Sequence, residues 1–339
     1  MSIEVISRPF CSLCNEEGKQ LYLATVDWLF GVPGNWGLRR CSSCDVAWLD
    51  PQPAPKDSDK LYARYYTHST NAPLTRLGRL RHATLKCVLA RLGYPVPRPK
   101  EILPQLLSHV RSVARAAALD VLALPASETG VLLDVGCGNG EFIARMSSLG
   151  WTVSGVDPDA TAVSYAWSRG LEVFRGTISD LPVTPCYDVI TLNHVVEHVI
   201  DPVGLLRECR KRLRPSTGRL IITTPNINSL GHWWFNRYWR GLEVPRHLVL
   251  FSQDSLRECV KRAGLSLYSL CTETRLARMI YSPSVCAKQD GRAIGERTSF
   301  KVSTRIAAYF FQGLEDLLLY LKKDLGEEIF CVCSAPTAV

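Results

Sequence analysis

Apolar runs and amphipathic segments alternate through the second half of the chain, and this alternation predicts the fold. Five short apolar runs are expected to be strands: 131–135, 152–156, 171–175, 187–192 and 219–224. Segments with apolar residues at three-to-four spacing lie between them and predict helices: 141–149, 159–169 and 202–213. Regular alternation of strand and helix is typical of a parallel sheet covered by helices. We therefore expect an α/β protein with a doubly wound, Rossmann-like sheet.

Glycines at alternate positions follow the first of these strands, at Gly136, Gly138 and Gly140. Glycine is needed where the chain turns sharply and a ligand touches the backbone. The second strand leads into Asp157, whose carboxylate is placed to accept hydrogen bonds from both hydroxyls of a ribose. The spacing is G-x-G-x-G and not the G-x-G-x-x-G of dinucleotide folds. A nucleotide-type cofactor is predicted, although Asp157 could also cap the following helix.

Four ordered motifs, LLDVGCGNGEF, VDPD, YDVITLNHVVEHVIDP and LRPSTGRLIITTPN, resemble those of the class I methyltransferases that use S-adenosylmethionine (SAM). The resemblance covers about residues 130–270 and the final strand, and it implies a seven-stranded sheet whose last strands are 265–272 and 328–334. It places these residues at the cofactor: Asp134, Gly136, Gly138, Gly140, Asp157, Thr177, Ile178 and Asn193. Many relatives carry an acidic residue where Thr177 stands. A different nucleotide cofactor and an inactive methyltransferase domain are the alternatives.

Two C-x-x-C pairs near the amino terminus predict a metal site. Their cysteines are Cys11, Cys14, Cys41 and Cys44, with 26 residues between the pairs. Four thiolates at this spacing match tetrahedral Zn²⁺ in a closed, structural site. A redox C-x-x-C, the alternative, normally sits beside a βαβ pattern, which this part of the sequence lacks. We expect a small zinc ribbon within a module spanning residues 1–70.

Basic residues are concentrated between this module and the sheet. The chain has a net charge of +8, and residues 76–130 hold nine basic and three acidic residues. Apolar spacing predicts helices at 77–92 and 102–124, separated by the proline-rich segment 94–99. Residues 71–128 are therefore expected to form a basic helical linker. An anionic membrane surface or RNA could bind residues 76–115, and a merely solvated face is the alternative.

Catalytic candidates follow the fourth strand. His194 and His247 are candidate general bases, because imidazole titrates near neutral pH. The small-RNA 2′-O-methylases and the ubiquinone-pathway O-methylases look similar here, with a metal-binding E-x-x-E-H and a distant histidine. That similarity implies a second divalent metal held by His194, Glu197, His198 and His247, although His194 replaces the first glutamate. Alternatively, Glu197 and His198 only cap and order the chain.

The segments after the fifth strand indicate which kind of molecule accepts the methyl group. Residues 129–339 are expected to form the methyltransferase domain, with an aromatic lid at 229–251 and a helical insertion at 273–327. The pattern W-x-G-x-E-x-P-R-H-L-x-L-F-S resembles methyltransferases encoded with polysaccharide and lipopolysaccharide assembly. It implies methyl transfer to a sugar, glycan-linked or related small-molecule acceptor. An RNA base methyltransferase and a non-catalytic SAM-fold binding protein are the alternatives.

Location and assembly follow from weaker patterns. The first residues lack a basic stretch followed by an apolar core, and nine further cysteines are unpatterned, which favours a reducing compartment. We expect a cytoplasmic protein, with attachment to a membrane surface left open. An apolar stripe in residues 304–325 is expected to dock on the protein or on a second subunit, giving a homodimer, or to lie on a membrane.

Overall fold

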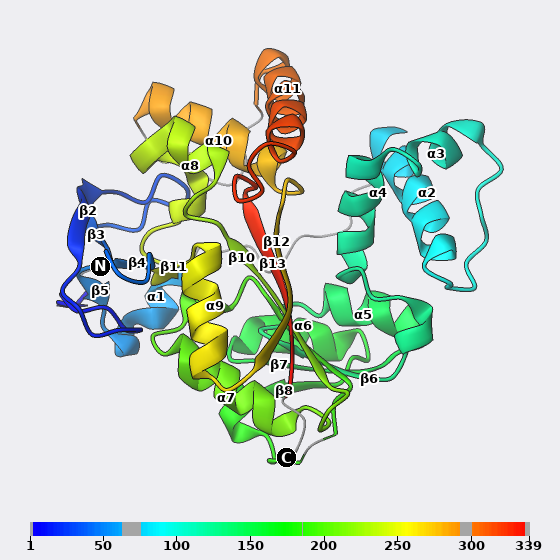
Figure 1. Cartoon of the computed structure of the whole chain (residues 1–339), viewed down its shortest axis with the longest axis horizontal. Coiled ribbons are helices and arrows are strands. Elements are labelled where there is room, and N and C mark those ends of the chain that lie inside the picture. Colours follow the sequence, from blue (N-terminus) through cyan, green and yellow to red (C-terminus); the bar gives the residue numbers. More distant parts are fainter. Residues whose placement is uncertain (1–2, 63–75, 185, 292–299, 336–339) are drawn as a thin grey trace. The chain divides into compact units, whose positions relative to one another are not determined.

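Seven strands form the main sheet of this protein, whose computed structural model describes residues 3–62, 76–184, 186–291 and 300–335. They are β6 (Val131–Val135), β7 (Thr152–Asp157), β8 (Val173–Arg175), β9 (Val189–Asn193), β10 (Arg219–Pro225), β12 (Ser266–Glu273) and β13 (Glu328–Ser334). Their order is β12-β13-β10-β9-β6-β7-β8 (Figure 1). Strands β6, β7 and β8 pair in parallel, and β12 pairs with β13 antiparallel. The predicted α/β class and seven-stranded sheet are confirmed.

The chain divides into two compact units. The first comprises Met1–Tyr65, Leu192–Lys211 and Ile222–Val339, and the second comprises Tyr66–Thr191 and Arg212–Ile221. The division runs through β9 and β10, each of which contributes residues to both units. The predicted boundary between residues 70 and 71 falls in 63–75, outside the described residues. The division into 1–70, 71–128 and 129–339 stays a prediction.

The described residues of the second unit form five α-helices, which are α2 (Arg76–Arg91), α3 (Ile102–Leu107), α4 (Arg111–Ala118), α5 (Glu141–Ser148) and α6 (Ala160–Ser168). Of these, α5 and α6 pack against the parallel strands, whereas α2 packs with α3 and α4. Helix α6 begins after Asp159, whose carboxylate accepts hydrogen bonds from the backbone N–H groups of Thr161 and Ala162 at 2.8 and 3.3 Å. Its buried face consists of Ala162, Val163 and Ala166. Local capping and apolar spacing therefore suffice to form this element.

The basic segment forms more helices than expected. The sequence predicts one helix over residues 102–124, and this prediction is wrong, because α3 and α4 are separate. Val110 is extended at the start of α4. The backbone carbonyl of Ser108, which would continue the helical ladder, instead accepts a hydrogen bond from the Arg91 guanidinium. Arg81 forms an ion pair with Asp120 at 2.9 Å, so part of the basic charge is used inside the unit.

The first unit carries a small antiparallel sheet around the cysteine pairs. Its strands are β2 (Lys19–Thr25), β3 (Trp36–Arg40), β4 (Ala47–Leu49) and β11 (Val249–Leu250), in the order β11-β4-β3-β2. A second sheet pairs β1 (Val5–Ile6) with β5 (Gln52–Pro53), and α1 (Ser58–Tyr62) follows. Strand β11 pairs Val249 with Trp48 and Leu250 with Ala47. Residues from far along the chain thus complete the amino-terminal module.

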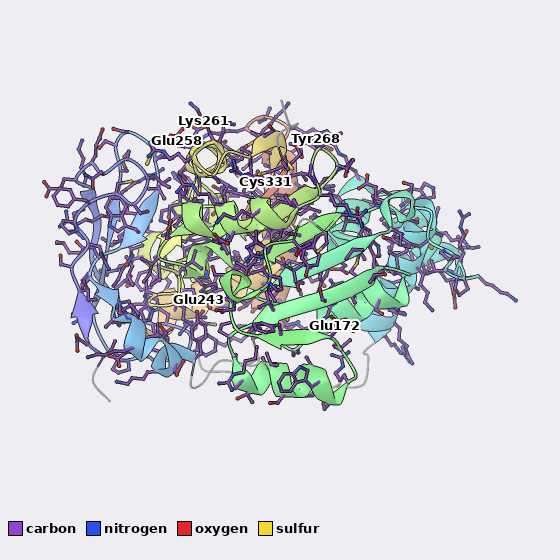
Figure 2. All side chains as sticks on the ribbon, turned by 90° about the horizontal axis from the view of Figure 1, so that it is seen from below. Glu172, Glu243, Glu258, Lys261, Tyr268 and Cys331 are labelled. Carbon is purple, nitrogen blue, oxygen red and sulfur yellow. The ribbon has the colours of Figure 1, made fainter. Side chains whose placement is uncertain are left out.

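Five further helices begin in the first unit: α7 (Pro202–Arg212), α8 (Leu230–Phe235), α9 (Gln253–Arg262), α10 (Ala277–Asp290) and α11 (Val302–Leu318). Helix α9 buries Leu256, Cys259 and Val260, while Glu258 and Lys261 lie on its outer side (Figure 2). Helices α10 and α11, which pack together, fall within the predicted insertion at 273–327. No helix in the described part of the chain is both long and apolar enough to cross a membrane.

Helix α11 turns a carboxyl group into the protein interior. The Glu315 side chain is fully buried, and so is that of Glu327, just before β13. Burial and then the charge of Glu327 raise the pKa of Glu315 well above its ordinary value. Burial also raises the pKa of Glu327 to about 7, against a 2.8 Å hydrogen bond from the Trp239 indole N–H. The pair therefore retains a proton near neutral pH.

Glu315→Gln is expected to stabilise the protein at pH 8. The unfolded chain releases the Glu315 proton near pH 4.3, whereas the folded chain holds it to higher pH, so the free energy of unfolding falls as pH rises above that value. Glutamine matches the protonated side chain in shape and removes this loss of stability. Thermal unfolding should show a higher Tm for the variant at pH 8 and a smaller difference at pH 5. The exposed Glu172 (Figure 2) gives the control substitution Glu172→Gln, and an equal pH dependence of wild type and Glu315→Gln contradicts the prediction.

Candidate active site

The loop after β6 has the backbone geometry that close contact with a ligand requires. Gly136, Gly138 and Gly140 have φ angles of 71°, 53° and 76°, a region that residues with a Cβ rarely adopt. A Cβ on Gly138 would meet no atom within 4 Å, so open space lies beside this residue. A Cβ on Gly140 would come within 2.5 Å of the Leu171 Cδ1 atom, so the Leu171 side chain would have to shift to admit one. The loop exposes backbone on one side and packs tightly on the other.

Asp157, at the end of β7, faces this loop. Its Oδ2 atom accepts a hydrogen bond from the Gly138 N–H and its Oδ1 atom accepts one from the Asp159 N–H, both at 2.8 Å. Burial raises the pKa of the Asp157 carboxyl, and these two hydrogen bonds oppose the rise. Each oxygen has a further lone pair available. The carboxylate is held rigidly and retains acceptor capacity for a ligand.

Asp134 lies deeper, within β6. Its side chain is almost fully buried, and the Thr191 hydroxyl donates a 2.6 Å hydrogen bond to its Oδ1 atom. Burial raises the pKa of Asp134 to about 7; the Thr191 hydrogen bond opposes this rise, and the charge of Asp157 adds to it. Asp134 stands two residues before Gly136, and its role at the cofactor stays a prediction.

Thr177 and Ile178 follow β8 and open a short 3-10 turn. Ile178 is buried, whereas Thr177 uses both its N–H and its hydroxyl to donate 2.8 Å hydrogen bonds to the Asp180 carboxylate. These hydrogen bonds lower the pKa of Asp180. The sequence analysis overlooked Asp180. The available signal was its place in the sequence: Asp180 lies three residues after Thr177, the position where many relatives have an acidic residue.

Asn193 and His194 stand at the carboxyl end of β9, in the first unit. The Asn193 Oδ1 atom accepts a 2.6 Å hydrogen bond from the Thr223 hydroxyl. His194 has a φ angle of 57°, and its imidazole meets Glu197 Oε1 at 3.1 Å and Glu328 Oε1 at 2.7 Å. Burial alone would lower the pKa of His194, but the hydrogen bonds and charges of the two glutamates outweigh it and raise the pKa to about 9. His194 is therefore a cation at neutral pH, with both ring nitrogens donating.

His198 and His247 form a second pair of rings beside Glu197. Their centroids are 4.8 Å apart in an edge-on arrangement. His198 Nδ1 meets the Arg246 carbonyl oxygen at 3.0 Å, and His247 Nδ1 meets the Gly241 carbonyl oxygen at 2.8 Å. A carbonyl only accepts, so each Nδ1 carries a proton, and a ring that is neutral keeps a lone pair at Nε2. Ligand atoms of Glu197, His198 and His247 all lie within 4.8 Å of one another.

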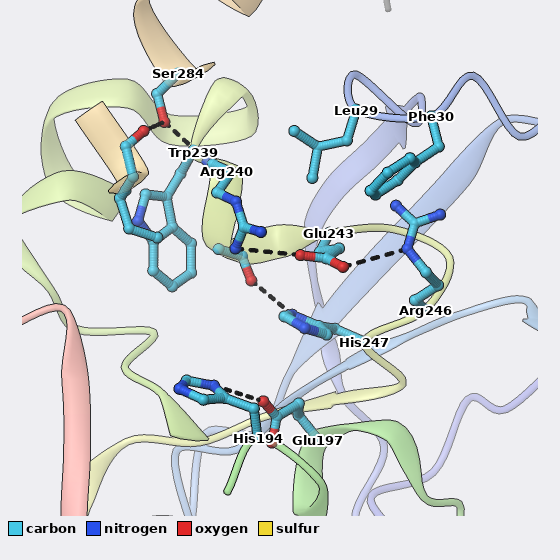
Figure 3. A network of polar contacts seen from close by, with 12 residues as sticks. Leu29, Phe30, His194, Glu197, Trp239, Arg240, Glu243, Arg246, His247 and Ser284 are labelled. Carbon is cyan, nitrogen blue, oxygen red and sulfur yellow. Dashed lines mark hydrogen bonds and ion pairs between the residues drawn. The ribbon is translucent and has the colours of Figure 1, made fainter. Parts of the chain in front are cut away.

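His247 is held in its uncharged form. Burial lowers its pKa to about 4, although the Glu243 charge opposes this shift. Figure 3 shows its imidazole below the chain of ion pairs that runs from Arg240 through Glu243 to Arg246. At neutral pH the cluster thus contains a neutral imidazole at His247, which can accept a proton, and an imidazolium at His194, which can stabilise negative charge.

Arg246 connects this cluster to the cysteine-containing module. Its guanidinium is fully buried and binds both carboxylate oxygens of Asp27 at 2.9 and 3.1 Å. It also lies over the Phe30 ring, 4.4 Å from the centroid (Figure 3). Asp27 in turn accepts hydrogen bonds from backbone N–H groups in the loop between β2 and β3. The module therefore fixes the backbone on which His247 stands.

The aromatic segment at 229–251 divides into buried and exposed parts. Trp239 is buried and donates its indole N–H to Glu327, and the buried His232 meets the Tyr22 hydroxyl at 2.8 Å. Trp233 and Trp234 are exposed, with 71% and 48% of their surface accessible. The segment is anchored at one side and presents two indole rings at the other. Its role as a lid stays a prediction.

The four cysteines of the amino-terminal pairs come together. Cys11 and Cys44 have sulfur atoms 3.5 Å apart, Cys14 and Cys41 3.2 Å, and Cys14 and Cys44 3.8 Å. All four sulfurs lie within 4.8 Å of one another. Such a group of thiols suits a single tetrahedral ion.

Comparisons with known proteins agree with this fold. A family model described as a methyltransferase domain matches residues 106–270. The ubiquinone biosynthesis O-methyltransferase of Caulobacter sp. (strain K31) is 39% identical over 103 residues, which are 28% of this chain and 40% of that protein. The protein of the same name from Xanthomonas oryzae pv. oryzae (strain PXO99A) is 35% identical over 163 residues, 45% of this chain and 66% of its own length.

The matches to these curated relatives span less than two-thirds of their length. Among solved structures, geranyl diphosphate C-methyltransferase from Streptomyces coelicolor A3(2) has 15% sequence identity and a TM-score of 0.46, covering 84% of this chain and 99% of that one. The family model, the sheet order and the glycine loop followed by Asp157 lead to one assignment. Residues 106–270 therefore form a methyltransferase domain with the class I, SAM-dependent fold.

Proposed function

We propose that this protein transfers the methyl group of SAM to a hydroxyl of a small-molecule acceptor, and that the acceptor is a sugar or a glycan-linked compound. The observation that carries the proposal is the cofactor loop, in which Gly138 leaves open space beside the fixed Asp157 carboxylate. Relatives named O-methyltransferases support oxygen as the acceptor atom. The neutral His247 is the matching chemical group, because a hydroxyl must lose its proton during transfer.

The second unit supplies the cofactor-binding residues. Asp157 accepts hydrogen bonds from the ribose hydroxyls, and the glycines of the loop face the methionine portion of SAM. Asp134 supports the loop from below, while Thr177 and Ile178 lie beside the adenine. Asn193, which the resemblance also assigns to SAM, lies at the end of β9. Methyl transfer then proceeds directly from the sulfonium to the acceptor oxygen.

The first unit supplies the chemistry at the acceptor. The Nε2 lone pair of His247 can receive the hydroxyl proton, because its Nδ1 is occupied as a donor to the Gly241 carbonyl. His194 cannot do so at neutral pH, since its pKa of about 9 keeps it protonated. Its charge, balanced by Glu197 and Glu328, instead stabilises negative charge that develops nearby.

The same cluster fits a divalent ion. One carboxylate and two imidazoles form a donor set that suits a transition metal, and Glu197, His198 and His247 provide it. Backbone carbonyls fix both Nδ1–H groups and so orient both Nε2 atoms, as is usual around metal-binding histidines. When bound, an ion there would acidify an acceptor hydroxyl. In the cysteine module, the four sulfurs support structural Zn²⁺.

The exposed aromatic rings support the acceptor class. Flat rings stack on sugar faces, and Trp233 and Trp234 present indoles at the surface of the 229–251 segment. Arg237, also exposed, can pair with a phosphate of a glycan carrier or a nucleotide sugar. The predicted lid, residues 229–251, also contains His247.

Tracing a labelled methyl group tests the proposed function. Purified protein is titrated with SAM by calorimetry and then incubated with methyl-labelled SAM and a fractionated cell extract. Label in the nucleotide-sugar or lipid-linked glycan fraction is the expected result. Label in RNA would overturn the acceptor class, and SAM binding without label in any fraction would favour a non-catalytic binding protein.

His247→Ala should lower kcat by about 100-fold or more, because a positioned general base contributes about that much. The dissociation constant of SAM, measured by calorimetry, should stay unchanged. His109→Ala, at an exposed histidine, is the control and should keep the wild-type rate. Unchanged turnover of His247→Ala would remove this residue from the mechanism. A wild-type rate that falls with chelator and returns with added divalent metal assigns His247 to metal binding.

A further inference from the structure

Helix α11 presents its most apolar side to solvent. Ile306, Phe310, Leu314, Leu317 and Leu321 recur at spacings of three or four residues, so they form one stripe along the helix and the turn after it. Phe310, Leu317 and Leu321 have 75%, 62% and 83% of their surface accessible. A surface helix normally turns polar residues outward. This stripe therefore needs an explanation.

The opposite side of α11 already packs against the protein. Ala308 and Phe311 are buried, and Phe311 contacts Tyr281 of α10 with ring centroids 5.0 Å apart. Two acidic groups of this helix also turn toward the protein: Glu315 is buried, and Asp316 accepts a 2.6 Å hydrogen bond from the Thr274 hydroxyl. The packing of α11 against its own unit therefore does not use the outward stripe.

Neighbouring helices also carry exposed apolar side chains. Trp234 of α8 packs edge-on against Phe311, with centroids 6.3 Å apart, and Trp233 beside it is largely exposed. Met279 of α10 is exposed as well. Figure 1 shows α8, α10 and α11 grouped at one end of the first unit. Exposed apolar side chains thus occur on three neighbouring helices, whereas an isolated exposed leucine would need no explanation.

Basic residues border the stripe at both ends. Lys301 and Arg305 are exposed at the amino-terminal end of α11, and Lys322 and Lys323 are exposed just beyond its carboxyl-terminal end. Lys322 approaches Asp324 at 3.7 Å, an exposed pair of little energetic weight. An apolar face flanked by exposed lysine and arginine is complementary to a surface that is apolar inside and anionic outside.

This charge pattern argues against a second copy of the chain as the occupant. Two α11 stripes packed antiparallel would set Lys301 and Arg305 of one copy against Lys322 and Lys323 of the other. A parallel arrangement would set each basic end against its equivalent. Both arrangements bring like charges together, which costs free energy at an interface.

We propose that the exposed face of α11 binds the surface of an anionic lipid bilayer. The helix lies in the plane of the interface, with the stripe among the outer acyl chains and the terminal basic residues at the lipid headgroups. Tyr309 and Trp233 fit this position, because amphipathic rings favour the membrane–water boundary. The proposal is independent of methyl transfer, since it requires neither SAM nor an acceptor.

Co-sedimentation of the full chain with vesicles tests the proposal. Vesicles of phosphatidylcholine with one-third phosphatidylglycerol should bind the protein, and pure phosphatidylcholine should bind it much more weakly. Phe310→Ser/Leu317→Ser should reduce binding to anionic vesicles by about tenfold or more, through lost apolar burial. Lys322→Gln/Lys323→Gln should reduce it by about tenfold, and high salt should have the same effect on the wild type.

Leu23→Ser provides the matched control, because Leu23 is 87% exposed on β2 and lies outside these helices. This variant should bind vesicles as the wild type does, and circular dichroism checks that every variant is folded. Equal binding to neutral and anionic vesicles, or full binding by Phe310→Ser/Leu317→Ser, would overturn the proposal. A dimer by light scattering that dissociates in Phe310→Ser/Leu317→Ser, without vesicle binding by the wild type, would assign the face to self-association.

Discussion

Replacing Asp157 with alanine is expected to weaken SAM binding by about 100-fold or more, because two hydrogen bonds to a charged acceptor disappear together. The carboxylate is fixed by the Gly138 and Asp159 N–H groups, so it meets the ribose hydroxyls without reorganising. Fixed geometry reduces the entropic cost of binding, and the substitution removes that advantage as well. Calorimetric titration with SAM measures the change directly.

Asp159→Ala is the matched control for this experiment. Asp159 is also an acidic residue, two positions further on, and it caps α6 through the N–H groups of Thr161 and Ala162. Its loss should cost about 1 kcal/mol of stability, with SAM affinity changed by only a few-fold. Wild-type affinity in Asp157→Ala would contradict the assigned role of Asp157. Equal losses in both variants would point to a disturbed loop instead of a missing contact.

Cys41→Ser is expected to remove bound zinc and to unfold the amino-terminal module. A structural zinc site typically contributes on the order of 10 kcal/mol to folding, and losing one of four ligands removes a large part of it. The damage should spread to the candidate catalytic cluster, because Asp27 of this module binds the buried Arg246 next to His247. Methyl transfer should therefore fail, whereas SAM binding by the second unit should remain within a few-fold of the wild type.

Three measurements separate these effects: zinc content by elemental analysis, the Tm of unfolding, and SAM affinity by calorimetry. Cys186→Ser changes a cysteine outside the cluster and should leave one zinc per chain and the wild-type Tm. A Cys41→Ser chain that transfers methyl groups at the wild-type rate would contradict the structural role of the module. Simultaneous loss of SAM binding would show that the damage extends beyond the first unit.

The sequence predicted those parts of the fold that local patterns encode. Each of the seven strands of the main sheet is present where an apolar run indicates it, and the two C-x-x-C pairs bring their four sulfurs together. Strand formation and metal-ligand spacing depend on neighbours along the chain, so a single sequence contains the necessary information. The failed helix at 102–124 shows the limit, because the Ser108 carbonyl at its break accepts a hydrogen bond from Arg91, a residue of another helix.

Long-range polar partners were the part that could not be predicted. Glu328 binds His194, and Asp27 binds Arg246, across 134 and 219 positions in the sequence. No periodicity or spacing connects residues so far apart. A weak signal existed for Glu328, because a charged residue opening the apolar strand EIFCVCS requires a partner when buried. The pKa of His194, and with it the chemical role open to this residue, depends on that partner.

The pairing of β11 with β4 has a consequence for the synthesis of the protein. Trp48 leaves the ribosome about 200 residues before Val249, its partner in the small sheet. At about 5–20 residues per second, that interval is roughly 10–40 seconds. During this time the edge of β4 opposite β3 has no strand beside it, while the cysteines that precede β4 are already available to metal. Early metal capture would then hold the nascent module closed until its last strand arrives.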